Sequence, residues 1–143
     1  MYLNSFLIYP IGCSDSCRVA SNLLKNAGFS VTDHPTPEVT HLLLDVPSFD
    51  TSGFLKDGSD LKEMLRMLPK SLTIIGGNLN QTCLQDYRTV DLLQDPYYLA
   101  KNAAITAECA LQVAASYLHT TFPDSPALIL GWGRIGKKHQ VIK

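Results

Sequence analysis

The chain has 143 residues, 45% of them apolar, so its length suits one domain of ordinary size with a sizeable core. This composition excludes a disordered chain and a collagen-like repeat. The net charge of -1 excludes an overall basic field for nucleic acid or an anionic membrane. No apolar run approaches the roughly 20 residues that span a bilayer, and the first residues lack the basic segment of a secretory signal. We therefore expect a cytoplasmic protein that binds neither nucleic acid nor membrane.

The cysteines and histidines do not form a recognisable metal site. None of the four cysteines stands in a CxxC pair or beside a histidine, and the four histidines are scattered. We expect no metal and free, mostly buried thiols. The cysteines are Cys13, Cys17, Cys83 and Cys109.

The amino-terminal residues predict a strand followed by a helix. The apolar run from Leu3 to Tyr9 ends at Pro10 and Gly12, as a buried strand that leads into a loop does. Gly28 stands where a glycine commonly ends a helix. Three polar residues can cap this helix, and five apolar residues recur along it at 3.6-residue spacing: Ser14, Asp15 and Ser16, then Val19, Ala20, Leu23, Leu24 and Ala27.

Strands and helices continue to alternate through the middle of the chain. Residues 29–32 and 41–44 predict two strands, and the continuous apolar run of the second is typical of a strand buried on both faces. A polar loop then extends from Asp45 to about Ser59. Residues 60–68 predict a helix that Pro69 ends.

The remaining elements lead to a second glycine-rich turn. Residues 72–75 predict a fourth strand closed by Gly76 and Gly77, followed by a helix or irregular segment at 80–86 and a weak strand at 89–93. Thr106 can cap a long helix that ends near His119, whose many alanines permit close packing. A last strand, residues 127–130, runs directly into Gly131.

This order of elements predicts an α/β fold with a parallel, flavodoxin-like or Rossmann-like sheet and flanking helices. An interdomain helix and the first strand of an incomplete Rossmann domain follow. We therefore expect a substrate-side domain at residues 1–100, the helix at 101–122 and the beginning of a dinucleotide-binding domain at 123–143.

Residues 127–136 read ALILGWGRIG and carry the glycine order G-x-G-x-x-G directly after a predicted strand. In dinucleotide-binding folds the first glycine makes a tight turn, the second admits the pyrophosphate and the third packs helix on strand. The pyrophosphate then lies at the amino terminus of the following helix. The predicted cofactor-binding residues are Gly131, Gly133, Arg134, Ile135 and Gly136.

The glycine turn conflicts with the residues that follow it. A complete unit needs roughly 30 residues and an acidic ribose-binding residue about 20 positions further on. Only KKHQVIK follows Gly136. We therefore expect the amino-terminal part of a longer protein, cut at an experimental boundary, by a gene-prediction error or by a frameshift.

Residues 86–137 resemble the linker, interdomain helix and nucleotide turn of the dipicolinate synthase A-subunit family. The loop at residues 45–48 and the glycine pair after the fourth predicted strand resemble the amino-terminal domain of that family more loosely. The layout is also similar to D-2-hydroxyacid dehydrogenases and S-adenosylhomocysteine hydrolases. Residues 102–109 depart from the family pattern N-A-I-P-T-A-E-G, with Ile105 at the proline and Cys109 at the last glycine.

The resemblance implies an NAD(P)-dependent oxidoreductase that acts with a second, flavoprotein-like subunit. Such an enzyme oxidises a dihydrodipicolinate-type precursor to dipicolinate, the calcium chelator of endospores, with NAD or NADP as the hydride acceptor. A homo-oligomer is a further expectation. Because most of the nucleotide domain is lacking, we expect this chain alone to be inactive and to bind no nucleotide.

The resemblance also implies site residues in the cleft between domains. Asn102 and Thr106, together with Gly76 and Gly77, are the predicted contacts of a small dicarboxylate. Glu108 is the best catalytic candidate, by position alone.

Simpler interpretations stand beside these. Thr106 and Glu108 fit a helix cap and a first-turn acid, the glycine pair fits a turn with positive φ, and residues 14–16 fit helix capping. Asp45 is not expected to be a phosphoacceptor, because the acidic pair that holds magnesium in receiver domains is missing after the first predicted strand. For the whole chain, the alternatives are a non-catalytic flavodoxin-like binding or regulatory module and a D-2-hydroxyacid dehydrogenase-like domain.

Overall fold

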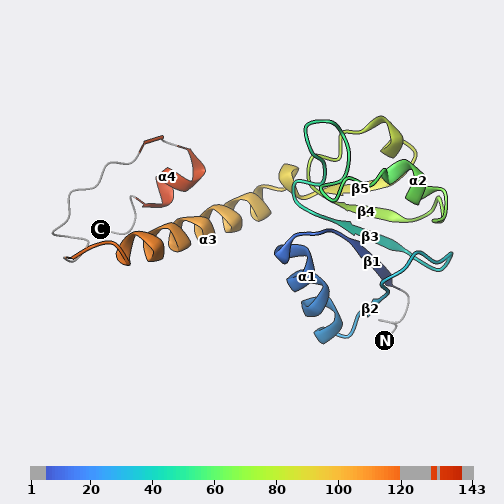
Figure 1. Ribbon diagram of the computed structural model, residues 1–143, viewed down its shortest axis with the longest axis horizontal. Coiled ribbons are helices and arrows are strands. Elements are labelled where there is room, and N and C mark those ends of the chain that lie inside the picture. Colours follow the sequence, from blue (N-terminus) through green and yellow to red (C-terminus); the bar gives the residue numbers. More distant parts are fainter. Residues whose placement is uncertain (1–5, 120–129, 132, 140–143) are drawn as a thin grey trace. The chain divides into compact units, whose positions relative to one another are not determined.

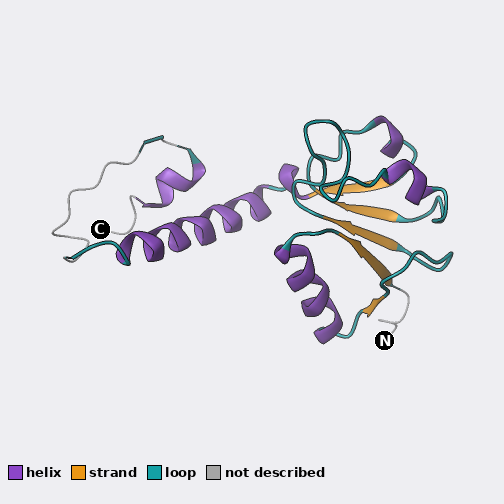
Figure 2. Cartoon of the chain, viewed as in Figure 1, coloured by secondary structure: helices purple, strands orange, loops and turns teal. Residues whose placement is uncertain are grey.

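The computed structural model describes residues 6–119, 130–131 and 133–139. The chain divides into two compact units, Met1–Gln94 and Asp95–Lys143. Within the described residues, all strands belong to the first unit, and the second contains two helices (Figure 2). The elements of the first unit are β1 (Leu7–Ile11), α1 (Asp15–Asn26), β2 (Ser30–Val31), β3 (His41–Leu44), α2 (Leu61–Leu65), β4 (Thr73–Gly76), η1 (Thr82–Leu84), β5 (Arg88–Asp91) and η2 (Leu92–Gln94). Those of the second are α3 (Pro96–Ala115) and α4 (Arg134–His139).

The five strands form one parallel sheet in the order β2-β1-β3-β4-β5 (Figure 1). This is the flavodoxin-like order, so the predicted fold class is confirmed. Successive connections run in opposite directions from the centre, since β1 leads to β2 on one side and β3 leads to β4 on the other. Right-handed crossovers therefore place α1 and α2 on opposite faces of the sheet.

The expectation that Pro10 ends the first strand is wrong. β1 continues through Pro10 to Ile11, and Pro10 lies opposite Leu43 of β3. The carbonyl of Ile8 accepts from Thr32 on the β2 side. Because backbone groups alternate sides along a strand, Pro10 also turns its nitrogen toward β2, which has already ended at Val31. The missing N–H therefore costs the sheet no hydrogen bond.

The core lies mainly on one face of the sheet. Leu42, Leu44 and Ile74 are almost fully buried and pack with Leu61 and Leu65 of α2. The alternate residues of the same strands are only half-buried. The expectation that residues 41–44 are buried on both faces is therefore wrong, because α1 covers its own face of the sheet incompletely.

Helix α1 uses a different face from the predicted one. Val19 and Leu23 are 53% and 62% exposed, whereas Cys17 is buried and Ala20 and Leu24 are half-buried. Residues 17, 20 and 24 share one helix face at three- and four-residue spacing, and residue 19 lies about 200° around the helix from residue 17. Ser14 caps the helix and Gly28, with φ +88°, follows its end, as predicted.

Helix α3 begins earlier than expected. Asp95 caps it by accepting from the N–H groups of Tyr97 and Tyr98, and Pro96 occupies the first turn. Thr106 and Glu108 lie in the middle of this 20-residue helix, so the interpretations as cap and first-turn acid are wrong. The Asp-Pro pair was the missed signal. Within the described residues, no helix is both long and apolar enough to cross a membrane.

The predicted helix or irregular segment at 80–86 is a single 3-10 turn, η1, and the weak fifth strand is present as β5. Residues 127–129 of the predicted last strand lie outside the described part of the chain. Leu130 is 87% exposed, and α4 begins directly after Gly133. The predicted helix start in the glycine turn is therefore confirmed.

Candidate functional site

The strand order defines where a ligand is expected. The connections of β1 and β3 leave the sheet in opposite directions, and ligands of open parallel sheets bind outside the carboxyl ends of the strands at such a point. The loops after β1, β3 and β4 meet at this edge, which we call the switch-point edge.

Asp45 connects the loops after β1 and β3. It directly follows β3 and is only 4% exposed. Its Oδ2 accepts from the Cys13 N–H at 3.0 Å, and its Oδ1 accepts from the Ser14 hydroxyl. Ser14 in turn accepts from the Cys17 N–H at 3.1 Å as the cap of α1. One carboxylate therefore fixes the loop after β1 and the start of α1.

Position 12 has room only for glycine, because the side chains of Asp45 and Cys17 approach its Cα closely. A Cβ at this position would lie 2.7 Å from both the Asp45 Oδ1 and the Cys17 Sγ. Burial raises the pKa of the Cys17 thiol, and the charges of Asp45 and Cys13 add to the effect. Cys17 is therefore a buried neutral thiol, whereas Cys13 and Cys109 are exposed, which the prediction of mostly buried thiols missed.

Gly76 and Gly77 are explained by packing inside the protein. Ser48 is 1% exposed; its hydroxyl donates to the Asp45 carbonyl at 2.7 Å and accepts from the Gly77 N–H at 3.0 Å. A Cβ on Gly76 would lie 2.3 Å from this hydroxyl, and one on Gly77 would lie 2.8 Å from Val46 Cγ1. Neither glycine has a positive φ, so that interpretation is wrong: the left-handed residue is Asn78, with φ 58°.

Asp91 organises the loop after β4 from the end of β5. Its carboxylate accepts from three backbone N–H groups, those of Asn78, Leu79 and Leu93, at 2.9 to 3.1 Å. Sequence reasoning missed this role and that of Asp45. In both cases an acidic residue at the end of a parallel strand was the available signal.

A cavity of about 420 Å³ opens beside α1 at the end of β1. This volume is within the usual range for small-ligand sites. Its walls are mostly polar and carry two cations: Pro10, Gly12, Cys13, Ser14, Cys17, Arg18, Ser21, Asn22 and Lys25. Arg18 pairs with Asp15 at 2.8 Å. The space over Asp45 itself is too tight to admit a water molecule, so a ligand at this edge has room beside α1.

The predicted residues of α3 do not all share one face. The Thr106 hydroxyl donates to the Asn102 carbonyl at 2.8 Å, which places the two residues one above the other. Glu108 lies about 200° around the helix from Thr106. All three are exposed. Helix geometry therefore allows Asn102 and Thr106, but not Glu108, to contact the same small molecule directly from this helix.

The glycine turn has the local geometry expected of a pyrophosphate site. Gly131 has φ +104°, and among the described residues no atom lies within 4 Å of a Cβ built on Gly131 or Gly133. Arg134 and Ile135 open α4, and Gly136 is buried. α4 packs beside α3, whose Ala103 and Ala107 are buried. A cavity of about 370 Å³ between these helices is lined by Pro96, Leu99, Ala100, Ala103, Arg134 and Lys137.

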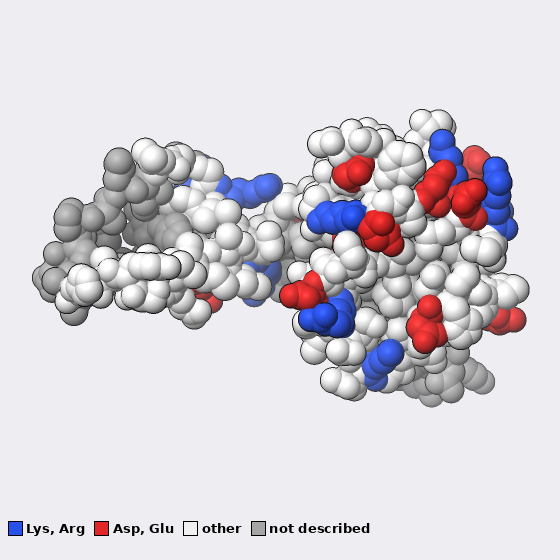
Figure 3. All heavy atoms as spheres, viewed as in Figure 1, with Lys and Arg blue, Asp and Glu red and all other residues white. Residues whose placement is uncertain are grey.

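The predicted substrate contacts belong to both units. Gly76 and Gly77 are in the first, and Asn102 and Thr106 are in the second. Their common contact with one ligand stays a prediction. Basic and acidic side chains lie interspersed on the face of the first unit seen in Figure 3.

The sequence matches no protein-family model and no curated protein. Its structure is similar to the crystal structure of the dipicolinate synthase A-subunit from Bacillus halodurans, with a TM-score of 0.70 and 17% identity over 96% of this chain. It is also similar to the A chain of dipicolinate synthase from Bacillus subtilis, with a TM-score of 0.59 and 17% identity over 95% of this chain. The chain spans 57% and 56% of these two proteins. At this identity the likeness shows a shared fold.

Proposed function

We propose that this chain supplies the substrate-side domain and the first nucleotide-binding turn of an NAD(P)-dependent oxidoreductase related to the A-subunit of dipicolinate synthase. The observation that carries the proposal is the structural match over 96% of the chain, which extends past the parallel sheet. The reaction proposed is oxidation of a dihydrodipicolinate-type precursor to dipicolinate, in concert with a flavoprotein-like second subunit.

The glycine turn fits one half of a dinucleotide site. The positive φ of Gly131 makes the bend. No atom of the described residues would meet a Cβ on Gly133, so a phosphate could approach the backbone there, and the N–H groups at the start of α4 favour an anion. Arg134 adds a positive charge. NAD or NADP, when bound, supplies the nicotinamide ring that accepts a hydride.

The residues of this chain would bind and orient the dicarboxylate. In the first unit, the cavity beside α1 is lined by the Asn22 side chain and the Lys25 ammonium, which can bind an anionic group. In the second unit, the Asn102 side chain would donate to a carboxylate, and Thr106, whose hydroxyl donates to the Asn102 carbonyl, would position it. Aromatisation also releases a proton. Because Glu108 lies on the opposite side of α3 from Thr106, we do not propose it as the direct acceptor of that proton.

A chimeric enzyme tests the function. Residues 1–136 replace the matching region of the Bacillus subtilis protein, and formation of reduced nicotinamide is followed in the presence of the second subunit. We expect turnover that depends on the dihydro precursor and on NAD or NADP. Asn102→Ala should lower kcat/KM by about 10-fold or more, because it removes a hydrogen bond to a carboxylate, whereas Glu63→Gln, an exposed acid on α2, should leave kcat/KM unchanged. A folded chimera without turnover would overturn the proposal.

A non-catalytic binding module is the second candidate. At the switch-point edge, Asp45 and Asp91 already accept hydrogen bonds from backbone and hydroxyl donors, so the described residues offer no free base there. This candidate predicts that a dicarboxylate raises the Tm of the 143-residue chain while the chimera stays inactive.

A further inference from the structure

A second hollow lies away from the switch-point edge and from the proposed function. It encloses about 510 Å³ between α2 and the segment that leads into β5. The connection from β4 to β5 contains only the short turn η1 where flavodoxin-like folds usually place a helix. The hollow therefore follows from a missing layer of the fold. We call it the α2 hollow; its lining residues are Lys62, Leu65, Arg66, Leu68, Lys70, Cys83 and Tyr87.

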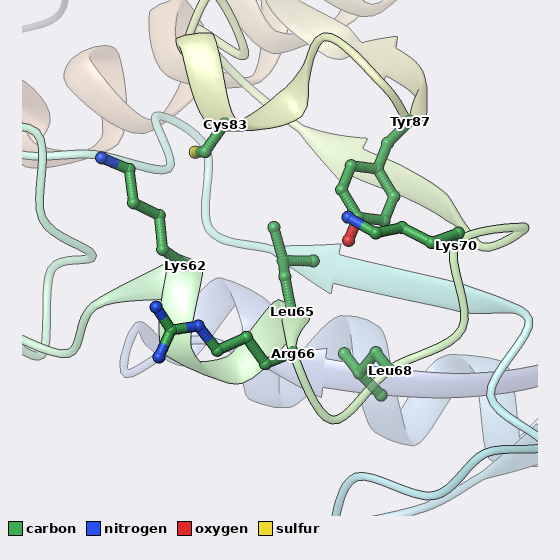
Figure 4. Close-up of a pocket in the computed structure, with 7 residues that line it drawn as sticks. All are labelled: Lys62, Leu65, Arg66, Leu68, Lys70, Cys83 and Tyr87. Atoms are coloured by element: carbon green, nitrogen blue, oxygen red, sulfur yellow. The ribbon is translucent and has the colours of Figure 1, made fainter.

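Three cations surround an apolar floor in the α2 hollow. Figure 4 shows Lys62 of α2 and Arg66, which follows the end of α2, on one side, Lys70 beside the Tyr87 ring on the other, and Leu65 between them. Within the part of the chain that the structure describes, none of these cations has a carboxylate within ion-pair distance. Asp86 is the acid whose charge acts on Lys70. Two separate positive ends with an apolar middle therefore face the hollow.

Tyr87 adds a hydrogen-bond donor without an acceptor. The residue is 8% exposed, and its hydroxyl is buried with no partner of hydrogen-bond geometry. The Lys70 ammonium lies 4.6 Å from the ring centroid, and the nearby hydroxyl raises the pKa of Lys70. Both groups are donors. Because an unpaired buried hydroxyl costs free energy, an anionic oxygen that accepts from both would relieve this cost.

We propose that the α2 hollow binds a small organic dianion with a flat apolar centre, such as an aromatic dicarboxylate. One anionic group lies between Lys62 and Arg66, and the other accepts from Lys70 and the Tyr87 hydroxyl. The apolar centre covers Leu65. The volume is that of an ordinary small-molecule site, and the lining supplies both positive charge and apolar surface.

Titration of the full 143-residue chain with benzene-1,3-dicarboxylate, followed by 1H–15N NMR, tests the proposal. We expect saturable shifts at the amides of Leu65, Cys83 and Tyr87. The double variant Lys62→Gln/Arg66→Gln and the single variant Tyr87→Phe should each weaken binding about five-fold or more. Lys101→Gln, an exposed helical lysine in the other unit, should leave the affinity unchanged.

Benzoate and inorganic phosphate are the comparison probes. Benzoate has one charge and should bind at least about five-fold more weakly, and phosphate lacks the apolar centre and should bind more weakly still. Equal affinity for benzoate, equal affinity of the double variant, or no saturable shift would overturn the proposal. Shifts confined to Cys13, Ser14 and Asp45 would also overturn it, because they would assign the dicarboxylate to the cavity of the proposed function.

Discussion

Gly76→Ala tests whether the glycine pair after β4 is required by packing within the protein. The added Cβ would lie 2.3 Å from the Ser48 hydroxyl and 3.1 Å from both Leu44 Cβ and Leu79 Cδ2. Ser48 cannot move freely, because its hydroxyl holds the Asp45 carbonyl and the Gly77 N–H. The substitution must therefore either compress the core or break these hydrogen bonds.

The expected loss of stability follows from these contacts. Overpacking a rigid site costs about 1–3 kcal/mol, and displacement of Ser48 would add about 1 kcal/mol for each hydrogen bond lost. We therefore expect Gly76→Ala to lower the free energy of unfolding by about 3 kcal/mol. For a unit of this size, such a loss corresponds to a fall in Tm of about 10 °C or more.

Urea unfolding of Gly76→Ala, Ser48→Ala and the double variant measures this effect as a double-mutant cycle. Because Ser48→Ala removes the clashing oxygen, the double variant should lose at least about 1 kcal/mol less than the sum of the two single variants. Gly133→Ala is the control, since no atom of the described residues lies within 4 Å of its added Cβ. A loss below about 1 kcal/mol for Gly76→Ala, or strict additivity, would refute the packing explanation and favour a ligand as the reason for the glycine.

Three further predictions concern the same unit. Asp45→Asn replaces one of the two accepting oxygens with an NH2 group, so either the Cys13 N–H or the Ser14 hydroxyl loses its acceptor. In urea unfolding this should destabilise the chain by about 1–3 kcal/mol. Unchanged stability would contradict the role of Asp45. Burial, with a smaller effect from Arg88, lowers the pKa of His41 below its usual 6.5. The unfolded chain therefore protonates His41 more readily than the folded chain does. The free energy of unfolding should fall as the pH drops through 6.5 toward the native pKa. His41→Gln should reduce that slope between pH 5 and 8, and an equal slope would exclude His41 as its cause. Under native conditions Ellman's reagent should modify the exposed Cys13 before the buried Cys17, as mapped by mass spectrometry; equal rates would contradict the burial of Cys17.

Much of the first unit could be predicted because its strands are short apolar runs separated by strong turn signals. β3 has the predicted bounds, and β2, β4 and β5 differ from prediction by one or two residues at each end. Burial was harder to predict, since a run such as residues 41–44 looks the same whether one or both faces are covered. The apolar face of α1 was misassigned in part, because the buried face includes Cys17 along with Ala20 and Leu24 and leaves out Val19 and Leu23.

The site could be predicted only in part. The glycine turn and the Ser14 cap have local signatures, since each depends on backbone geometry within a few residues. Asp45 and Asp91 act across 12 to 32 residues of sequence. Their positions at strand ends were a local signal, but they do not say which distant backbone groups the carboxylates bind. The α2 hollow could not be predicted from the sequence. It exists because the connection from β4 to β5 contains only the short turn η1, which leaves the space beside α2 unfilled.

The position of Pro10 also has a consequence for association between molecules. β2 covers only the first half of β1, so the second half would otherwise offer an open row of donors and acceptors to a strand from another chain. Proline at this point removes the N–H donor that such a strand would need. Pairing of a second chain along this edge of β1 is therefore disfavoured, although no further strand or helix of the described residues covers the edge.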